Sequence, residues 1–195
     1  MSSSQLEADV GRLAESLGQL PEATVAPTLV VVSGLPGTGK SSFSRRLAQR
    51  LPFLILESDA LRKTLFNPPD YSLAESGRLF RACHLIIQRL LERGIPVIFD
   101  ATNLSEKHRE RLYSIADHLG ARLILVRVEA PAGVVHERLG ARQRGAAPAT
   151  SSDADWGVYQ RMRPSVDKIR RKHYAVDTSR DITPVLDKIV REVGR

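Results

Sequence analysis

The sequence predicts a three-layer α/β fold, in which helices cover both faces of a five-stranded parallel sheet. Short apolar runs rich in β-branched residues alternate along the chain with segments of helical periodicity. These runs lack polar alternation, which is typical of parallel strands buried on both faces. The length of 195 residues and the 42% hydrophobic content suit one main domain with a single sizeable core.

The expected strands are the five apolar runs. They occupy residues 28–33, 53–56, 95–99, 123–128 and 174–176. In such a sheet ligands bind beyond the carboxyl ends of the strands. We therefore look for chemistry in the segments that directly follow each run.

The segments between the runs predict helices. Their ranges are 41–51, 72–93, 105–119, 132–144 and, in one or two pieces, 153–173. Before the first strand, apolar residues recur at spacings of three and four from Leu6 to Leu20, and Pro21 closes this helix. We expect residues 1–26 to form an N-terminal helical extension and residues 27–195 to form the main domain.

Composition narrows the class of protein. The 29 Lys and Arg against 22 Asp and Glu give a net charge of +7, which favours phosphate-bearing ligands without identifying one. The single cysteine, Cys83, excludes an internal disulfide and a cysteine cluster for zinc. The N-terminus lacks the pattern of a signal peptide and no run approaches the length of a membrane span, so we expect a cytoplasmic protein without membrane contact.

A phosphate-binding loop follows the first strand. Residues 34–41, GLPGTGKS, match G-x-x-x-x-G-K-[ST] at every fixed position. Glycines let the backbone N–H groups wrap one phosphate, and the start of the next helix adds its positive dipole end. The residues expected to bind ATP are Gly34, Pro36, Gly37, Thr38, Gly39, Lys40, Ser41 and Ser42. Lys40 would reach the β- and γ-phosphates, and Ser41 would ligate Mg²⁺.

Asp100, which ends the run 95–99, is the second candidate for the metal side of the site. The next residue is Ala101, where hydrolases of the oligomeric motor type place a glutamate to activate water. The base-recognition motif N-K-x-D of GTPases is absent. The sequence therefore favours transfer of phosphate to an acceptor over hydrolysis.

Asp59 and Arg62 follow the second strand. A helix beginning there places both on one face, because they lie three residues apart. A kinase acting on an alcohol needs a carboxylate to take the hydroxyl proton, and a cation can hold an anionic acceptor. The alternative is that Asp59 only caps the helix.

Arg138 and Arg142 lie four residues apart in the expected helix 132–144, and a Gly/Ala-rich segment, 145–150, follows them. This pattern predicts a mobile lid over about 132–165, whose arginines would stabilise the transferring phosphoryl group. Arg144 is a third candidate. A solvated basic face is the alternative.

The chain resembles the P-loop kinases of the polynucleotide 5′-hydroxyl kinase type over about residues 28–178. The motif D-x-x-R of that family matches Asp59 and Arg62, its D-[TA]-[TN]-N matches residues 100–103, and its paired lid arginines match Arg138 and Arg142. The resemblance implies the P-loop kinase fold, ATP with Mg²⁺, Asp59 as general base and Arg62 on an acceptor phosphate. Gluconate, antibiotic and zeta-type kinases share most of these marks.

The acceptor is the least determined part of this interpretation. A nucleic-acid 5′-hydroxyl end is favoured, a small-molecule alcohol is the first alternative, and a regulatory ATP-binding module without catalysis is the second. The basic residues of 161–172 are either a track for an acidic polymer or a solvated helix. Residues 177–180 line the adenine pocket or form only a turn after the last strand. The sequence leaves the oligomeric state and the preferred base open.

Overall fold

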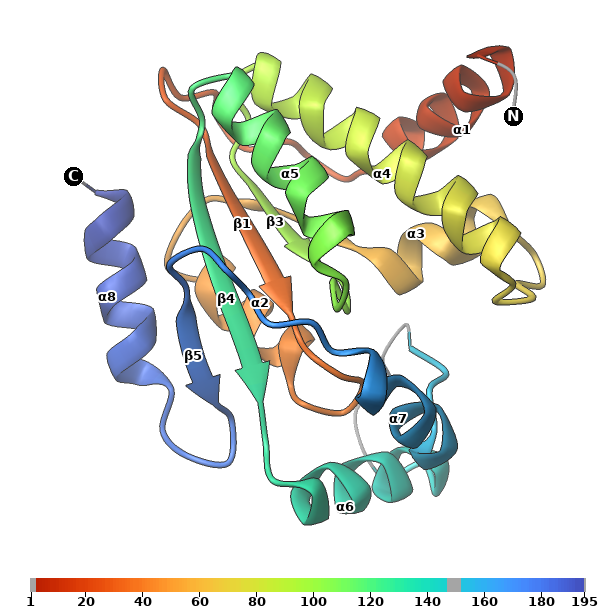
Figure 1. Ribbon diagram of the computed structural model, residues 1–195. Helices are drawn as coiled ribbons and strands as arrows, with labels where there is room; N and C mark the ends of the chain where they lie inside the picture. The colour runs from red at the N-terminus through yellow and green to blue at the C-terminus, as the bar shows by residue number, and fades with distance from the viewer. Residues whose placement is uncertain (1–2, 147–151, 195) are drawn as a thin grey trace.

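The computed structural model describes residues 3–146 and 152–194 and contains the expected parallel sheet (Figure 1). The strands run in the order β2-β3-β1-β4-β5, and every neighbouring pair is parallel. Their bounds are β1 Thr28–Ser33, β2 Leu54–Glu57, β3 Val97–Asp100, β4 Arg122–Glu129 and β5 Tyr174–Asp177. Each predicted strand is thus confirmed to within two residues at its start and one at its end.

The register of the sheet brings the polar strand ends together. Glu57 of β2 lies opposite Asp100 of β3, and Asp100 lies opposite Val32 of β1. The segments that follow these strands therefore leave from one edge of the sheet, where the sequence places its candidate functional residues.

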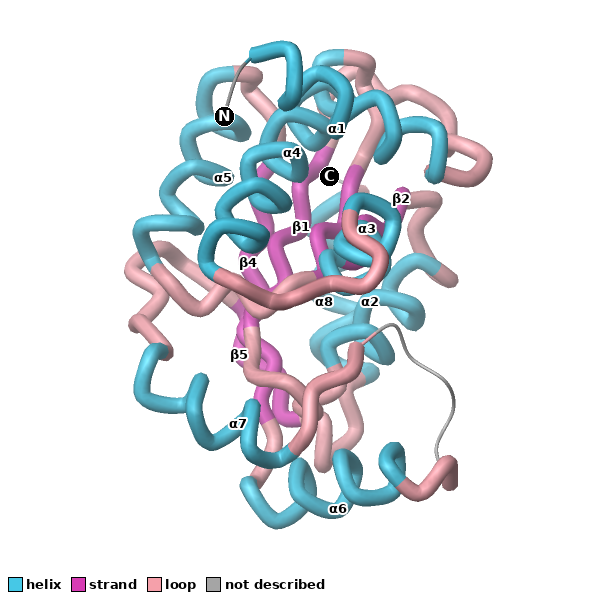
Figure 2. Tube along the Cα trace, turned by 90° about the vertical axis from the view of Figure 1, so that its right-hand side faces the viewer, coloured by secondary structure: helices cyan, strands magenta, loops and turns pink. Residues whose placement is uncertain are grey.

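Helices cover both faces of the sheet (Figures 1 and 2). One face carries α1 Ser3–Ser16, α3 Ser58–Leu65, α4 Leu73–Glu92 and α5 Glu106–His118; the other carries α2 Lys40–Ala48 and α8 Thr183–Val193. Because β1 is central, its alternating side chains enter two cores. Val31 packs in the core under α4, and Val32 packs in the core under α2.

The N-terminal helix α1 shares the core of the main domain. Val10 and Leu13 are buried in the same cluster as Leu79 of α4. Asp9, also fully buried, accepts hydrogen bonds from Arg78 Nε at 2.6 Å and from Arg12 Nη2 at 2.7 Å. These ion pairs hold the pKa of Asp9 down to about 2, with the hydrogen bond from Arg78 as the largest cause.

Two helices lie beyond the carboxyl edge of the sheet, where the sequence predicts a lid. They are α6 Ala132–Gln143 and α7 Trp156–Met162, followed by a 3₁₀ turn over Arg163–Ser165. Val135, Leu139 and Tyr159 form a separate small core, against which Leu35 of the phosphate loop packs. The segment 145–150, expected to be flexible, lies for the most part outside the described residues.

Two sequence expectations about helices need correction. The expected helix over 153–173 is limited to α7 and the 3₁₀ turn after it, which ends at Ser165. Pro164 cannot continue an α-helix, and Arg109 hydrogen-bonds the carbonyls of Asp167 at 2.9 Å and Lys168 at 3.2 Å. The basic residues after 165 therefore lie on an irregular segment. Helix α8 was not predicted, although its apolar spacing around Leu186 and Ile189 indicates it.

Candidate active site

The phosphate loop leaves β1 in a conformation that depends on glycine. The Gly34 N–H donates to the Thr102 carbonyl at 3.0 Å, and a Cβ at Gly34 would lie 2.3 Å from the Val128 carbonyl oxygen. Any side chain there would displace β4 or the loop. Within the loop, Thr38 Oγ1 donates to the Leu35 carbonyl at 2.8 Å, and Pro36 is buried. Ser42, expected at the nucleotide, is exposed on α2.

Lys40 lies at the start of α2, where its side chain folds back over the loop. Its Nζ donates to the Leu35 carbonyl at 3.1 Å. Burial lowers the pKa of the Lys40 ammonium, and the nearby carboxylates of Asp100 and Asp59 oppose that effect. The structure thus brings together three residues that the sequence places in three separate motifs.

Asp100 has the surroundings expected of a metal ligand. Its carboxyl is buried at the end of β3, and Oδ2 has no hydrogen-bond partner in the described part of the chain. Burial raises the pKa of Asp100, while the charge of Lys40 and the hydroxyl of Ser41 oppose this. A carboxylate beside a hydroxyl, with an oxygen left without a partner, fits the hard oxygen ligands that Mg²⁺ prefers.

No cluster of three or more histidine, cysteine, aspartate or glutamate side chains that could hold a metal occurs within residues 3–146 and 152–194.

Glu57 is a residue of this region that sequence reasoning missed. Together with Ser41 and Asp100 it lines a cavity of about 380 Å³, which also touches Leu17 at the end of α1. Its charge acts on Lys40 in the same sense as those of Asp100 and Asp59. Glu57 is the last residue of β2 and lies level with Asp100. An acidic residue at the end of a strand is the signal that could have identified it.

Asp59 lies in the first turn of α3 and is half-buried. Its carboxylate makes no hydrogen bond to another described residue, so it does not cap the start of its own helix with a side-chain hydrogen bond. Its charge reaches both Lys40 and Asp100. The Asp59 carboxylate is therefore near enough to the phosphate loop for its charge to act on Lys40 and is not engaged by a hydrogen bond within the described residues.

Arg62 is buried in a network of its own. Its Nη1 pairs with the Glu75 carboxylate, its Nη2 donates to Ser76 Oγ at 3.2 Å, and its guanidinium lies 4.9 Å from the ring centre of Tyr71. Only 7% of the residue is exposed. An acceptor phosphate at Arg62 would have to displace Glu75 or share the guanidinium with it.

The two arginines of α6, which the sequence predicts to belong to a lid, have different surroundings. Arg142 lies close enough to Lys40 for its charge to lower the Lys40 pKa, and its Nη1 is buried without a partner in the described part of the chain. Arg138, one turn earlier, donates to Thr178 Oγ1 at 2.8 Å and to the Thr178 carbonyl at 2.9 Å. Arg144 is exposed. Of the three, Arg142 is the one whose charge acts on Lys40, whereas Arg138 is connected to the phosphate loop through Thr178.

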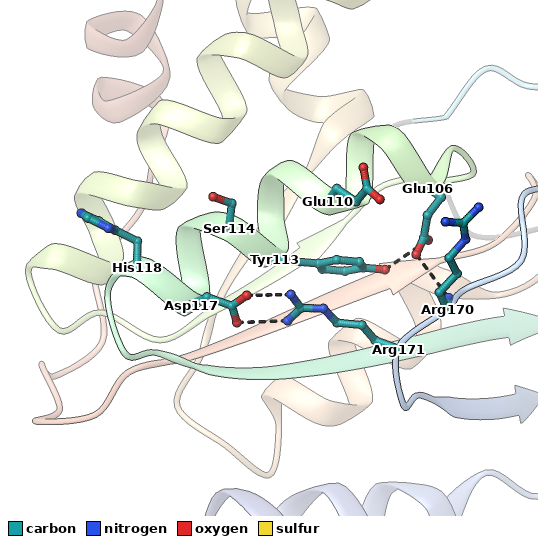
Figure 3. Close-up of a pocket in the computed structure, with 8 residues that line it drawn as sticks. All are labelled: Glu106, Glu110, Tyr113, Ser114, Asp117, His118, Arg170 and Arg171. Carbon is teal, nitrogen blue, oxygen red and sulfur yellow. Dashed lines mark hydrogen bonds and ion pairs between the residues drawn. The ribbon is translucent and has the colours of Figure 1, made fainter.

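A second, open cavity of about 640 Å³ lies along the outer side of α5 (Figure 3). There Arg171 forms two hydrogen bonds to Asp117, at 3.0 and 2.6 Å, and its guanidinium lies over the ring of Tyr113. The lining includes Arg170 and Arg171 of the basic segment 161–172, but none of the candidates in the phosphate loop, in α3, at Asp100 or in α6. We therefore place the chemistry at the phosphate loop.

Comparison with known proteins bears on the family and the fold of the chain. A family model described as "AAA domain" matches residues 29–169. A curated relative, the L-seryl-tRNA(Sec) kinase of Methanococcus maripaludis, is 25% identical over 115 residues, which cover 56% of this chain. The match spans 44% of the relative, less than half of its length.

Solved structures of two kinases share the fold. The APS kinase CysC of Mycobacterium tuberculosis, in complex with AMPPNP and APS, superimposes with a TM-score of 0.67 at 18% identity, over 87% of this chain and 99% of that one. A gluconokinase from Sinorhizobium meliloti 1021 gives a TM-score of 0.57 at 24% identity, over 85% and 89%. Within residues 3–146 and 152–194, no helix has the length and apolar character needed to span a bilayer.

Proposed function

The chain belongs to the AAA domain family, whose model matches residues 29–169, and from this premise we propose that it is an ATP-dependent kinase acting on an alcohol. The observation that carries the proposal is the position of Asp59. A carboxylate without a hydrogen-bond partner among the described residues is held on a helix beside Lys40, at the edge where the phosphate loop begins. General-base catalysis needs this carboxylate, whereas a protein that only bound nucleotide would tolerate an asparagine at the same position.

In the proposed reaction the acceptor hydroxyl oxygen forms a bond to the γ-phosphorus of ATP while the bond from that phosphorus to the bridging oxygen of ADP breaks. The hydroxyl proton passes to the Asp59 carboxylate, and ADP leaves. Lys40 and the loop N–H groups hold the β- and γ-phosphates, and Arg142 balances the charge on the transferring group.

Ser41 and Asp100 are the residues that would hold Mg²⁺. When bound, the ion supplies charge neutralisation between the β- and γ-phosphates. Asp100 Oδ2 has no hydrogen-bond partner among the described residues, which supports this assignment.

For the acceptor we propose a hydroxyl carried by a nucleic acid, namely the 5′-hydroxyl end that the sequence favours. The net charge of +7 and the similarity to a kinase that acts on a seryl-tRNA support it. If the acceptor is a nucleic acid, one of its phosphates replaces Glu75 as the ion-pair partner of Arg62.

The burial of Arg62 favours a second candidate, a small alcohol. A cation already paired with Glu75 and Ser76 is poorly placed to bind a polyanion. In this case α3 would supply only Asp59 to the acceptor, and no phosphate on the acceptor would be needed.

The test incubates the protein with γ-labelled ATP, Mg²⁺ and a panel of 5′-hydroxyl oligonucleotides, sugars and aminoglycosides. Transfer to an oligonucleotide that weakens steeply from about 50 to 200 mM salt would support the nucleic-acid acceptor, because phosphate contacts release counterions. Label on a sugar or aminoglycoside without that salt dependence would support the small alcohol.

Two control variants show whether the measured transfer comes from this protein or from a contaminating kinase. Lys40→Met should lose transfer by orders of magnitude. Lys188→Met, which removes an exposed lysine on α8, should retain it. ATP binding with no labelled acceptor would favour a non-catalytic binding module.

A further inference from the structure

Thr178, directly after β5, contacts two elements of the candidate site at once. Its Oγ1 donates to the Thr38 carbonyl of the phosphate loop at 2.6 Å and accepts from Arg138 Nη1 of α6 at 2.8 Å. Its own carbonyl accepts from Arg138 Nη2 at 2.9 Å. One hydroxyl therefore joins the loop that holds the phosphates to the helix that carries the lid arginines.

On the loop side the fit is close. Gly39 has a φ of +95°, and a Cβ there would lie 3.0 Å from Thr178 Oγ1. The Thr178 N–H also donates to the Glu129 carbonyl at the end of β4, at 2.9 Å. Thr178 is thus fixed to the sheet, and the phosphate loop is pressed against it.

On the other side of Thr178, its hydrogen bonds with Arg138 restrain the rotation of α6 about the helix axis. Arg138 and Arg142 lie four residues apart and so face the same side of the helix. Both outer nitrogens of the Arg138 guanidinium donate to Thr178, and one turn later lies Arg142, whose charge acts on Lys40. There the buried Arg142 Nη1 lacks a partner in the described part of the chain, as expected of a donor that awaits a phosphoryl oxygen.

We propose that Thr178 is a positioning residue for phosphoryl transfer: through Arg138 it holds the lid helix so that Arg142 faces the transferring group. The inference rests on the proposed kinase function. It assigns to Arg138 an anchoring role, distinct from the direct contact with phosphate that the sequence pattern suggests for both arginines.

The experiment compares binding of ADP with binding of ADP and aluminium fluoride, a mimic of the transferring phosphoryl group, by calorimetry in the presence of Mg²⁺. Thr178→Val removes the hydroxyl at nearly constant volume. It should weaken binding of the mimic by at least about tenfold, because a catalytic group displaced by about 1 Å costs on the order of 10²-fold, and should leave ADP binding nearly unchanged. Thr178→Ser should restore binding of the mimic.

Two further variants test the route through Arg138. The double variant Thr178→Val with Arg138→Gln should bind the mimic no more weakly than Arg138→Gln alone, since both remove one connection. Thr183→Val is the matched control: its hydroxyl also accepts from an arginine, Arg46 at 3.2 Å, but at the start of α8. It should behave as wild type.

Additive losses in the double variant, or unchanged binding of the mimic by Thr178→Val, would overturn the inference. A loss of ADP binding equal to the loss of mimic binding would also overturn it, since Thr178 would then act through the loop alone. Failure of the wild-type protein to bind the mimic more tightly than ADP would instead count against the proposed function. Thermal unfolding of each variant identifies any loss that comes from misfolding.

Discussion

Arg142 of α6 and Lys40 of the phosphate loop carry like charges that act on each other: burial lowers the pKa of Lys40, and the charge of Arg142 lowers it further. Two like charges at close range are unfavourable unless an anion accompanies them. The carboxylates of Asp100 and Asp59 equal these two cations in number. The negative charge of a nucleoside triphosphate would therefore also need the N–H groups of the phosphate loop, the start of α2 and a bound Mg²⁺.

Replacement of Arg142 should therefore reduce phosphoryl transfer. We expect Arg142→Gln to lower kcat by at least about 10²-fold, because a charged donor to the transferring group is lost. Arg144→Gln, two residues away and exposed, is the control and should stay near the wild-type rate. Steady-state kinetics with labelled ATP measure both. Equal rates for Arg142→Gln and Arg144→Gln would show that the lid arginine does not face the phosphates.

Asp100→Asn should raise the concentration of Mg²⁺ needed for half-maximal activity. The variant keeps one oxygen but loses the charge, and loss of a group that supports a metal typically costs on the order of 10- to 100-fold in affinity. Activity is titrated with Mg²⁺ at fixed ATP. Asp187→Asn, an aspartate of α8 whose side chain is 42% exposed, should leave the titration unchanged. An identical titration for Asp100→Asn would remove this residue from the metal side.

Glu75 and Arg62 test the nucleic-acid acceptor. Glu75→Gln weakens the ion pair that occupies Arg62, so the KM for a 5′-hydroxyl oligonucleotide should fall. Arg62→Ala should raise the same KM, while the KM for ATP stays constant in both variants. If both substitutions change only the melting temperature, Arg62 has a purely structural role and the small alcohol becomes the better candidate.

His84 predicts a pH dependence of stability. Burial, with added repulsion from Arg111 and His108, lowers its pKa from 6.5 to about 4 in the folded protein. Below pH 6.5 the unfolded chain binds the proton more readily than the folded one, so this contribution to stability is lost as the pH falls from 6.5 toward 4. Denaturant unfolding across this range should show a shallower decline for His84→Gln than for wild type. For His118→Gln, which replaces an exposed histidine, the decline should match that of wild type.

The sheet and the phosphate loop could be predicted from the sequence because their signals are local. The run over Thr28–Ser33 is apolar without alternation, and the fixed residues of the loop follow it directly. The predicted helix over 153–173 is confirmed over Trp156–Met162 and wrong after Ser165, for a reason that is not local. Arg109, more than fifty residues earlier, binds the carbonyls of Asp167 and Lys168, which a helix would need for itself.

Local sequence patterns also could not predict which residues the site residues contact. Arg62 pairs with Glu75 after an intervening loop, and Arg138 reaches Thr178 across 40 positions. Spacing on a helix predicts which residues share a face, but it does not show which partner occupies that face. This is why the paired arginines of the lid, alike in sequence, have different neighbours in the structure.

Replacement of Asp59 tests the proposed function most directly. The proposed reaction needs a carboxylate at this position to accept the hydroxyl proton, whereas nucleotide binding does not. The measurement is transfer from γ-labelled ATP to the acceptor found in the panel, together with calorimetry of ATP binding, for wild type and Asp59→Asn. We expect the variant to bind ATP as wild type does and to lose about 10²- to 10⁴-fold in kcat, the usual contribution of a general base. An Asp59→Asn protein that keeps more than roughly a tenth of the wild-type kcat would contradict the account, since this loss is well below that of a general base.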